Sequence, residues 1–224
     1  MPHKEPTATE ASETGKSSAR RRADGIRAYR CRHLIAVIEN PENPRNIGTV
    51  LRNVNAFGVE KVYVIDWRGA LPDDWQDLRE RRGLSKLSAS ASRWTSVKRY
   101  ASTAACVDYL RLKNFRSVVT SPHVKGKRTE ALEAVDYTAF PKLAVWFGNE
   151  GFGISAEAVE AAELCITIPM FGMVESLNLG TTSGIVLNEV TRQRRAYQAL
   201  YRKRNRKSPI APAGDGGRSD AAAR

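Results

Sequence analysis

Short apolar runs alternate with stretches of helical spacing along most of this chain, and this alternation limits the fold more than any other feature. Runs typical of buried strands lie at residues 34–38, 61–66, 97–100, 115–120, 143–147 and 165–168. Helices are expected between and after them, at residues 46–57, 103–113, 155–163 and 182–204. Strands that alternate with helices form parallel sheets, because a crossover brings each new strand beside an earlier one. The sequence therefore predicts an α/β fold with a mainly parallel sheet.

The chain is strongly basic, and its basic residues are concentrated near the two ends. Its 224 residues carry a formal net charge of +12. Residues 192–207 hold eight lysines and arginines with no acidic residue, and residues 20–32 hold six arginines against Asp24 alone. A basic surface attracts the phosphate backbone, so we interpret both clusters as nucleic-acid contacts, with solubilising tails as the alternative.

Length and composition indicate one folded domain with polar ends. A chain of 224 residues is long enough for one domain with a proper core. We expect a disordered basic N-terminal arm over residues 1–29, a folded domain over residues 30–204 that ends in a basic helix, and a disordered tail over residues 205–224. A polar connection over residues 67–82 is expected to include a short helix.

Several classes of protein are disfavoured by the composition. No apolar run approaches the roughly 20 residues of a membrane helix, and the N-terminus lacks an apolar signal-peptide core, so we expect no membrane contact and a cytoplasmic location. Cys31, Cys106 and Cys165 are widely spaced and odd in number, which supports neither a disulfide framework nor a zinc site. The histidines are scattered, so no metal is expected.

Three segments combine glycine, asparagine and other small polar residues between apolar anchors, at residues 43–53, 147–155 and 168–180. Such loops favour ligand binding by the backbone, because glycine lets the main chain approach a ligand closely. The second segment has the glycine spacing G-x-x-G-x-G, is not followed by Lys-Ser or Lys-Thr, and lies late in the chain. It therefore fits neither a dinucleotide-binding fingerprint nor a P-loop.

In this order, the three segments closely resemble the three motifs of the SpoU (TrmH-type) branch of the SPOUT RNA methyltransferases, over residues 30–204. The stretch Met170–Val174 looks most like the subgroup that methylates the ribose of guanosine 18 in tRNA. The resemblance implies the SPOUT fold, with a deep trefoil knot near the C-terminus, and a homodimer. It also implies metal-independent transfer of a methyl group from S-adenosyl-L-methionine to a ribose 2′-hydroxyl of RNA.

The resemblance assigns roles to individual residues. Arg52 matches the essential arginine of the family, and its polar partners match Asn46, Glu150, Ser176 and Asn178. The cofactor would be held by backbone groups and apolar walls at Thr120, Gly148, Ile168, Pro169, Met170 and Leu177. Because a guanidinium stays protonated, we expect Arg52 to clamp phosphate and steady a developing alkoxide. Glu150 would orient Arg52 or Asn46, or would act as the base. Each polar residue also has a simpler interpretation as a loop hydrogen bond or a helix cap.

Three functions are open on the sequence alone. A tRNA ribose methyltransferase fits best, and a ribosomal RNA substrate is the alternative, because the motifs set the reaction while the basic surface sets the RNA. A non-catalytic RNA-binding or ribosome assembly factor on the same fold is disfavoured by the intact set of polar motif residues. Glu175 stands where relatives often carry an amide, and Leu179-Gly180 where they often carry Val-Ser, which leaves substrate preference and the start of the last helix open.

Overall fold

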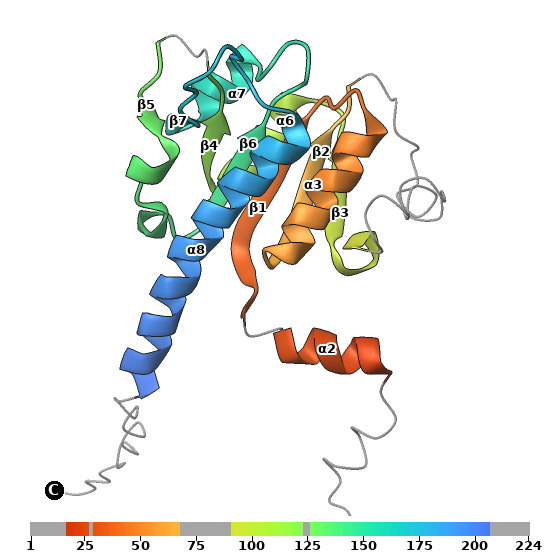
Figure 1. The fold of residues 1–224 in the computed structure, drawn as a ribbon, viewed down its shortest axis with the longest axis vertical. Helices are drawn as coiled ribbons and strands as arrows, with labels where there is room; N and C mark the ends of the chain where they lie inside the picture. Colours follow the sequence, from red (N-terminus) through yellow and green to blue (C-terminus); the bar gives the residue numbers. More distant parts are fainter. Residues whose placement is uncertain (1–16, 27–28, 68–90, 123–125, 207–224) are drawn as a thin grey trace, which may run out of the picture.

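The computed structural model describes residues 17–26, 29–67, 91–122 and 126–206 (Figure 1). The described strands are β1 (Cys31–Glu39), β2 (Val59–Ile65), β3 (Ser96–Tyr100), β4 (Arg116–Thr120), β5 (Thr129–Ala131), β6 (Leu143–Phe147) and β7 (Leu164–Thr167). The described α-helices are α2 (Ser18–Ile26), α3 (Pro44–Ala56), α6 (Thr103–Leu112), α7 (Ala156–Ala161) and α8 (Leu179–Arg206). Short 3₁₀ turns are η2 (Ala91–Trp94), η3 (Leu132–Ala134) and η4 (Tyr137–Ala139). The connection at 67–82 and the tail at 205–224 fall almost entirely outside the described residues.

The strands form one seven-stranded sheet in the order β3-β2-β1-β6-β4-β7-β5. Every pairing in it is parallel. The predicted α/β fold with a parallel sheet is therefore confirmed. The order also places β6, a late strand, between β1 and β4 at the centre of the sheet, so that segments far apart in the sequence end side by side.

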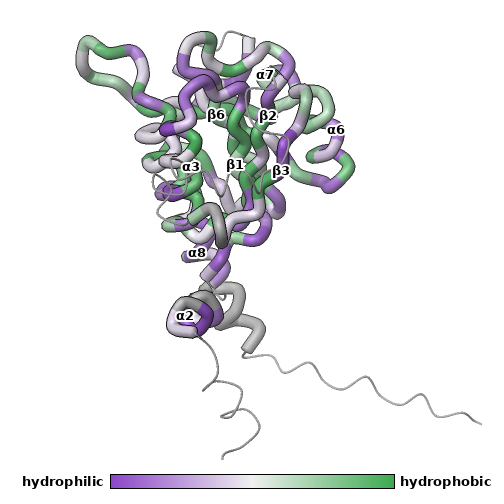
Figure 2. Tube along the Cα trace, turned by 90° about the vertical axis from the view of Figure 1, so that its right-hand side faces the viewer, coloured by the Kyte–Doolittle hydropathy of each residue, from purple (hydrophilic) through white to green (hydrophobic). Residues whose placement is uncertain are grey.

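Helices cover both faces of the sheet. Side chains on both sides of its strands are therefore buried, which is why the strands are continuous apolar runs in the sequence. On one face, α3 and α8 contribute Ile47, Leu51 and Leu187 to a buried cluster. On the other face, α6 and α7 contribute Cys106 and Ala158 to a second one. All five residues of β6 are buried, since a central strand covered on both sides exposes neither face. Figure 2 shows the hydrophobic colouring concentrated along β1 and β6.

Three elements differ from the sequence expectation. Residues Ser18–Ile26, inside the arm expected to be disordered, form α2, a helix of mainly good helix formers. The strand β5 was not expected, because its residues Thr-Glu-Ala show no apolar pattern; its backbone pairs with the edge of β7. The last helix begins at Leu179 rather than Thr182, because Asn178 caps it: its Oδ1 accepts a hydrogen bond from the backbone N–H of Gly180 at 2.8 Å.

A buried arginine fastens α8 to the segment before β6. The guanidinium of Arg194, which is 6% exposed, donates from Nη1 to the carbonyl oxygens of Tyr137 at 3.0 Å and Phe140 at 2.6 Å. Its Nη2 donates to the carbonyl oxygen of Pro141 at 3.1 Å. These carbonyls have no ladder partner in a sheet, so Arg194 satisfies groups that burial would otherwise leave unpaired.

Arg194→Met should therefore lower the free energy of unfolding by about 2–3 kcal/mol, because several carbonyl groups lose their donor at once. Urea denaturation followed by circular dichroism measures the loss. Arg192→Met is the matched control on the same helix: Arg192 is exposed and, within the described ranges, pairs with Glu189 alone, so its loss should cost less than about 1 kcal/mol. Equal losses in the two variants would contradict the role assigned to Arg194.

Candidate functional site

The loops that follow β1, β6 and β7 meet at one edge of the sheet, because parallel strands end on the same side. β6 pairs with both β1 and β4, and β4 pairs with β7. The three glycine-containing and polar segments of the sequence follow these strands and are brought together at this edge. The carboxyl ends of parallel strands are where α/β proteins bind ligands.

The carboxylate of Glu150 is the centre of a hydrogen-bond network between these loops. Its Oε1 accepts from Nδ2 of Asn46 at 2.7 Å and from the backbone N–H of Asn43 at 3.3 Å. Its Oε2 accepts from the backbone N–H of Glu42 at 3.1 Å. Asn43 is the N-cap of α3, so the carboxylate lies at the positive end of that helix. Glu150 therefore joins the loop after β6 to the start of α3.

These hydrogen bonds determine the charge of Glu150. Partial burial acts to raise the pKa of its carboxyl, but the hydrogen bonds from Asn46 and from the backbone N–H groups of Glu42 and Asn43 outweigh burial and hold the pKa below its ordinary value. Glu150 is therefore ionised at neutral pH.

Asn178 extends the network to α8. Its Nδ2 donates to Oδ1 of Asn46 at 3.1 Å, while its own Oδ1 caps the helix at Gly180. Gly180 can lie this close to α3 only because it has no side chain: a Cβ there would be 2.7 Å from Cγ2 of Thr49. The chain of hydrogen bonds from Glu150 through Asn46 to Asn178 thus connects all three loops.

The loop after β6 is a tight turn built on Asn149. Its backbone N–H donates to the carbonyl of Gly153 at 2.7 Å, and the N–H of Gly153 donates back at 3.0 Å. Its side-chain Oδ1 accepts from the backbone N–H groups of Gly151 at 2.7 Å and Phe152 at 2.9 Å. A Cβ on Gly148 would overlap the backbone of Gly153, so the turn requires glycine at position 148.

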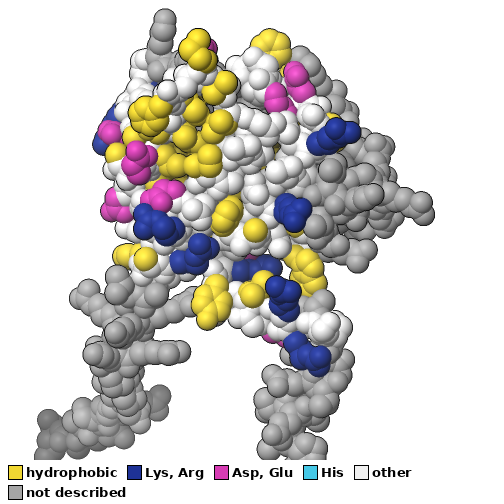
Figure 3. Space-filling view, viewed as in Figure 1, with side chains coloured by type: hydrophobic (Ala, Val, Ile, Leu, Met, Phe, Trp, Pro, Cys, Tyr) yellow, Lys and Arg dark blue, Asp and Glu magenta, His cyan; other side chains and the backbone are white. Residues whose placement is uncertain are grey.

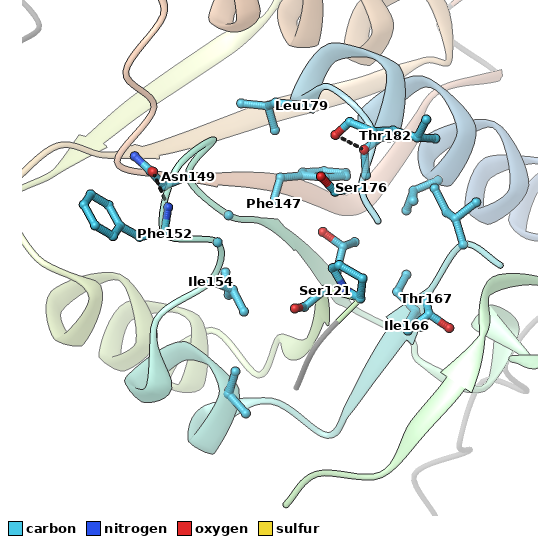
Figure 4. A pocket seen from close by; sticks show the side chains of 18 of the residues that line it. Ser121, Phe147, Asn149, Phe152, Ile154, Ile166, Thr167, Ser176, Leu179 and Thr182 are labelled. Carbon is cyan, nitrogen blue, oxygen red and sulfur yellow. Dashed lines mark hydrogen bonds between the residues drawn. The ribbon is translucent and has the colours of Figure 1, made fainter. Parts of the chain in front are cut away.

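A cavity of about 900 Å³ opens between the loops after β4, β6 and β7 and the start of α8 (Figure 4). Phe147, Ile166 and Leu179 contribute apolar surface to it. Of the eleven residues singled out from the sequence, those that line this cavity are Thr120, Gly148, Glu150, Ile168, Met170, Ser176 and Leu177. Pro169 does not line it, and Asn46 and Asn178 are connected to it through Glu150.

Arg52 is apart from the other four predicted catalytic residues. It is exposed on α3, about one and two-thirds turns after Asn46, and does not line the cavity. Within the described residues it has no hydrogen-bond or ion-pair partner. The structure of one chain therefore assembles Asn46, Glu150 and Asn178, with Ser176 at the cavity wall, and leaves Arg52 outside.

The sequence matches the SpoU rRNA Methylase family over residues 33–188. The chain belongs to this family. It is 29% identical over 175 residues to the tRNA (guanosine(18)-2′-O)-methyltransferase of Thermus thermophilus, a match that covers 78% of this chain and 82% of the relative. The crystal structure of the Aquifex aeolicus TrmH/SpoU tRNA modifying enzyme matches with a TM-score of 0.66 and 27% identity, over 82% of this chain and 87% of that one. The resemblance inferred from the three motifs is confirmed.

A more distant structure shares the fold. The SpoU methyltransferase AviRb from Streptomyces viridochromogenes, solved in complex with the cofactor AdoMet, matches with a TM-score of 0.61 and 23% identity over 72% of this chain and 60% of that one.

Two further observations concern metals and membranes. In the described part of this SpoU-family chain, no three His, Cys, Asp or Glu side chains are grouped as a metal site would need. Nor does any described helix have the length and apolar character to cross a bilayer.

The most informative residue that the motifs did not reveal is Glu39, at the end of β1. It is buried, and its carboxylate accepts hydrogen bonds from the N–H of Ser155 at 2.8 Å, from the Ser155 hydroxyl at 2.6 Å and from the Thr103 hydroxyl. Glu39 thus anchors the far end of the loop that carries Glu150. In the sequence, Glu39 could have been recognised only as an acidic residue at the end of an apolar strand. Cavity residues such as Ser121 and Thr182 had no such signal.

Glu150→Gln should lower stability at pH 7, and the loss should disappear in acid. A carboxyl whose pKa is depressed by folding contributes stability above its unfolded pKa of about 4.3, and that stability is lost as the pH falls through the lower folded value. Urea midpoints of the wild type and the variant measured at pH 7 and at pH 3 should therefore converge at the lower pH. Glu133→Gln, at an exposed position on η3, is the control and should change the midpoint little at either pH. A gap that is constant with pH would contradict the assignment.

Proposed function

We propose that this chain is an S-adenosyl-L-methionine-dependent RNA methyltransferase that modifies a ribose 2′-hydroxyl of tRNA, with guanosine 18 as the first candidate. The observation that carries the proposal is that Glu150, at the wall of the 900 Å³ cavity, is hydrogen-bonded through Asn46 to Asn178, in a chain of the SpoU family. The name of the Thermus thermophilus relative supports the substrate and the position.

The residues around the cavity fit S-adenosyl-L-methionine. Apolar walls at Phe147, Ile166 and Leu179 suit an adenine ring, and the close backbone packing at Gly148 leaves main-chain groups available to polar atoms. Carboxylates at Glu150 and Glu175 suit a ligand that carries a sulfonium cation. The cofactor, when bound, supplies the methyl group. AviRb, which shares the fold, was crystallised with AdoMet.

Glu150 would help to position the ribose and would not act as the base that accepts the proton of its 2′-hydroxyl. Three hydrogen bonds occupy the Glu150 carboxylate, and its lowered pKa makes it a weaker proton acceptor. Held in this way, Glu150 fixes the Asn46 amide, and Asn46 in turn fixes Asn178. Arg52 stays protonated and would bind phosphate or the developing alkoxide.

The exposed position of Arg52 supports a homodimer in which it acts at the site of the partner. A residue with no partner in the described part of its own chain is available to a second copy. The loop before α8 also carries large apolar side chains in solvent: Phe171 is 98% exposed, Met173 100% and Val174 61%. Such a patch is typical of a protein interface.

The family fold implies that the chain is knotted near its C-terminus, and we infer the same here. The packing of α8 supports this: it follows β7, far from β1 in the sheet, yet returns to lie against α3, the helix that follows β1. Such a return is what a chain that passes through an earlier loop would show.

Exposed basic side chains supply a surface for RNA. Arg20, Arg21 and Arg22 are exposed on α2, and Arg45 and Arg192 are exposed on α3 and α8. Figure 3 shows Lys and Arg side chains spread across the lower part of the described face, below a group of hydrophobic side chains. A tRNA substrate would also place the protein in the cytoplasm.

The first experiment is methyl transfer from radiolabelled S-adenosyl-L-methionine to unmodified tRNA and, separately, to ribosomal RNA, with nuclease mapping of the labelled nucleotide. Label in a tRNA ribose is the expected result. The family description, SpoU rRNA Methylase, supports ribosomal RNA as the second candidate. Label in ribosomal RNA alone would show that ribosomal RNA, and not tRNA, is the substrate. Cofactor binding without label in either RNA would favour a non-catalytic RNA-binding or assembly factor.

Arg52→Ala should reduce methyl transfer roughly 100-fold or more while the affinity for S-adenosyl-L-methionine stays near that of the wild type. Arg111→Ala, an exposed arginine on α6, is the matched control and should keep full activity. Retained turnover in Arg52→Ala would remove this residue from the site.

Mixing two inactive variants tests whether Arg52 acts across the dimer. Arg52→Ala and Glu150→Ala each lack one part of the site, so a mixed dimer would regain one complete site. After unfolding and joint refolding, activity should return to about a quarter of the wild-type value, since half of the dimers are mixed and each has one intact site of two. No recovery, with mixed dimers demonstrated by differently tagged chains, would place Arg52 in its own subunit's site.

A further inference from the structure

A lysine lines the cavity that would hold the cofactor. Among the described residues around this cavity of about 900 Å³, Lys127 carries the single positive side chain, whereas Glu150, Glu160 and Glu175 carry carboxylates. Lys127 lies between β4 and β5, outside the three glycine-containing segments of the sequence. The motif resemblance therefore assigns it no role.

Hydrogen bonds hold Lys127 between β7 and α7. The carbonyl oxygen of the next residue, Arg128, accepts from the N–H of Cys165 on β7 at 2.8 Å. The hydroxyl of Thr129 donates to the carbonyl oxygen of Lys127 itself at 3.1 Å. The side chain reaches α7, where its Nζ donates to the carbonyl oxygen of Glu160 at 3.1 Å. Both the backbone and the ammonium of Lys127 are thus fixed at the cavity wall.

The ammonium group of Lys127 keeps donors that a ligand can use. It has three N–H donors, and the bond to Glu160 is its one interaction with the described part of the chain. It forms no ion pair with any described carboxylate. The Glu160 carbonyl lies in the last turn of α7, where the helix dipole favours a cation. This bond therefore positions the positive charge without neutralising it.

The charges of S-adenosyl-L-methionine match this arrangement. Its methionine end carries a sulfonium, an ammonium and a carboxylate. Carboxylates on the cavity wall suit the two cations and repel the anion, so the anion needs a positive partner. A lysine ammonium is a compact charge that can donate to a carboxylate oxygen in a charge-assisted hydrogen bond. Within the described lining, Lys127 is the side chain that meets this need.

We propose that Lys127 binds the carboxylate of the methionine part of S-adenosyl-L-methionine and so selects a cofactor with an intact amino-acid end. The inference rests on the proposed function and deepens it, by giving cofactor selection to a residue outside the three segments. A cofactor without its carboxylate would leave the Lys127 ammonium facing two cations. Such a ligand is disfavoured by repulsion as well as by the lost hydrogen bond.

Isothermal titration calorimetry with the full chain, in the absence of RNA, tests the assignment with three ligands. S-Adenosyl-L-methionine is complete, decarboxylated S-adenosylmethionine lacks the carboxylate alone, and 5′-methylthioadenosine lacks the whole amino-acid end. Lys127→Met should weaken binding of the complete cofactor about tenfold, the effect of losing one charged hydrogen bond. Its affinity for 5′-methylthioadenosine should stay that of the wild type. The preference of the wild type for the complete cofactor over the decarboxylated one should shrink about tenfold or more.

Two further variants are the controls. Lys127→Arg keeps the positive charge and should retain most of the affinity for the complete cofactor. Lys113→Met removes an exposed lysine at the end of α6, which does not line the cavity, and should bind all three ligands as the wild type does.

Each contrary result has a distinct meaning. Unchanged affinity of Lys127→Met for the complete cofactor would overturn the proposal. Equal losses for the cofactor and for 5′-methylthioadenosine would also overturn it, because they would show damage to the wall. A loss of RNA affinity alone, measured by fluorescence anisotropy, would make Lys127 an RNA contact instead.

The same titrations separate this inference from the proposed function. If the wild type binds none of the three ligands, the proposed methyl transfer fails together with the inference. If neither tRNA nor ribosomal RNA is methylated but the cofactor binds with a preference that depends on Lys127, the proposed reaction fails while this binding residue stands.

Discussion

The site depends on one carboxylate that is held by three hydrogen bonds. Glu150 comes from the loop after β6, and its acceptors are filled by the Asn46 side chain and by backbone N–H groups at the start of α3. Asn178 then adds the start of α8 through Asn46. An ionised carboxylate at a helix N-terminus is stabilised by the helix dipole as well as by its donors. The network therefore fixes the relative positions of three loops that are far apart in the sequence.

That arrangement is possible only where the backbone comes unusually close to its neighbours. A side chain on Gly148 would overlap the turn at Gly153, and one on Gly180 would meet Thr49 on α3. The close approach of Gly180 to α3 also lets Asn53 of that helix bind the start of α8. Nδ2 of Asn53 donates to the carbonyl of Gly180 at 2.8 Å and to the Ser183 hydroxyl at 2.9 Å. Glycine in these motifs therefore serves the packing of the loops as much as it serves a ligand.

The sequence was most informative where burial dictates residue type. The expected strand at 143–147 coincides with β6, because a central strand must be apolar on both faces. Ser155 was expected to cap a helix and does so, accepting from the N–H of Ala158 at 3.2 Å. The edge strand β5 could not be predicted, since an edge pairs through its backbone and leaves no apolar pattern. Motif resemblance supplied Glu150 and Asn178 but not Glu39, whose function depends on which strands become neighbours.

General attraction to RNA and selection of a nucleotide would depend on groups that act at different distances from the RNA. A chain with a net charge of +12 attracts phosphate from several ångströms away, and this attraction is the same for every sequence. The cavity between the loops carries side chains of both signs, since Lys127 lines it together with Glu150 and Glu175. The basic surface therefore supplies the general attraction for the RNA backbone, and the hydrogen-bonding groups at the cavity supply what can distinguish one sugar or base from another.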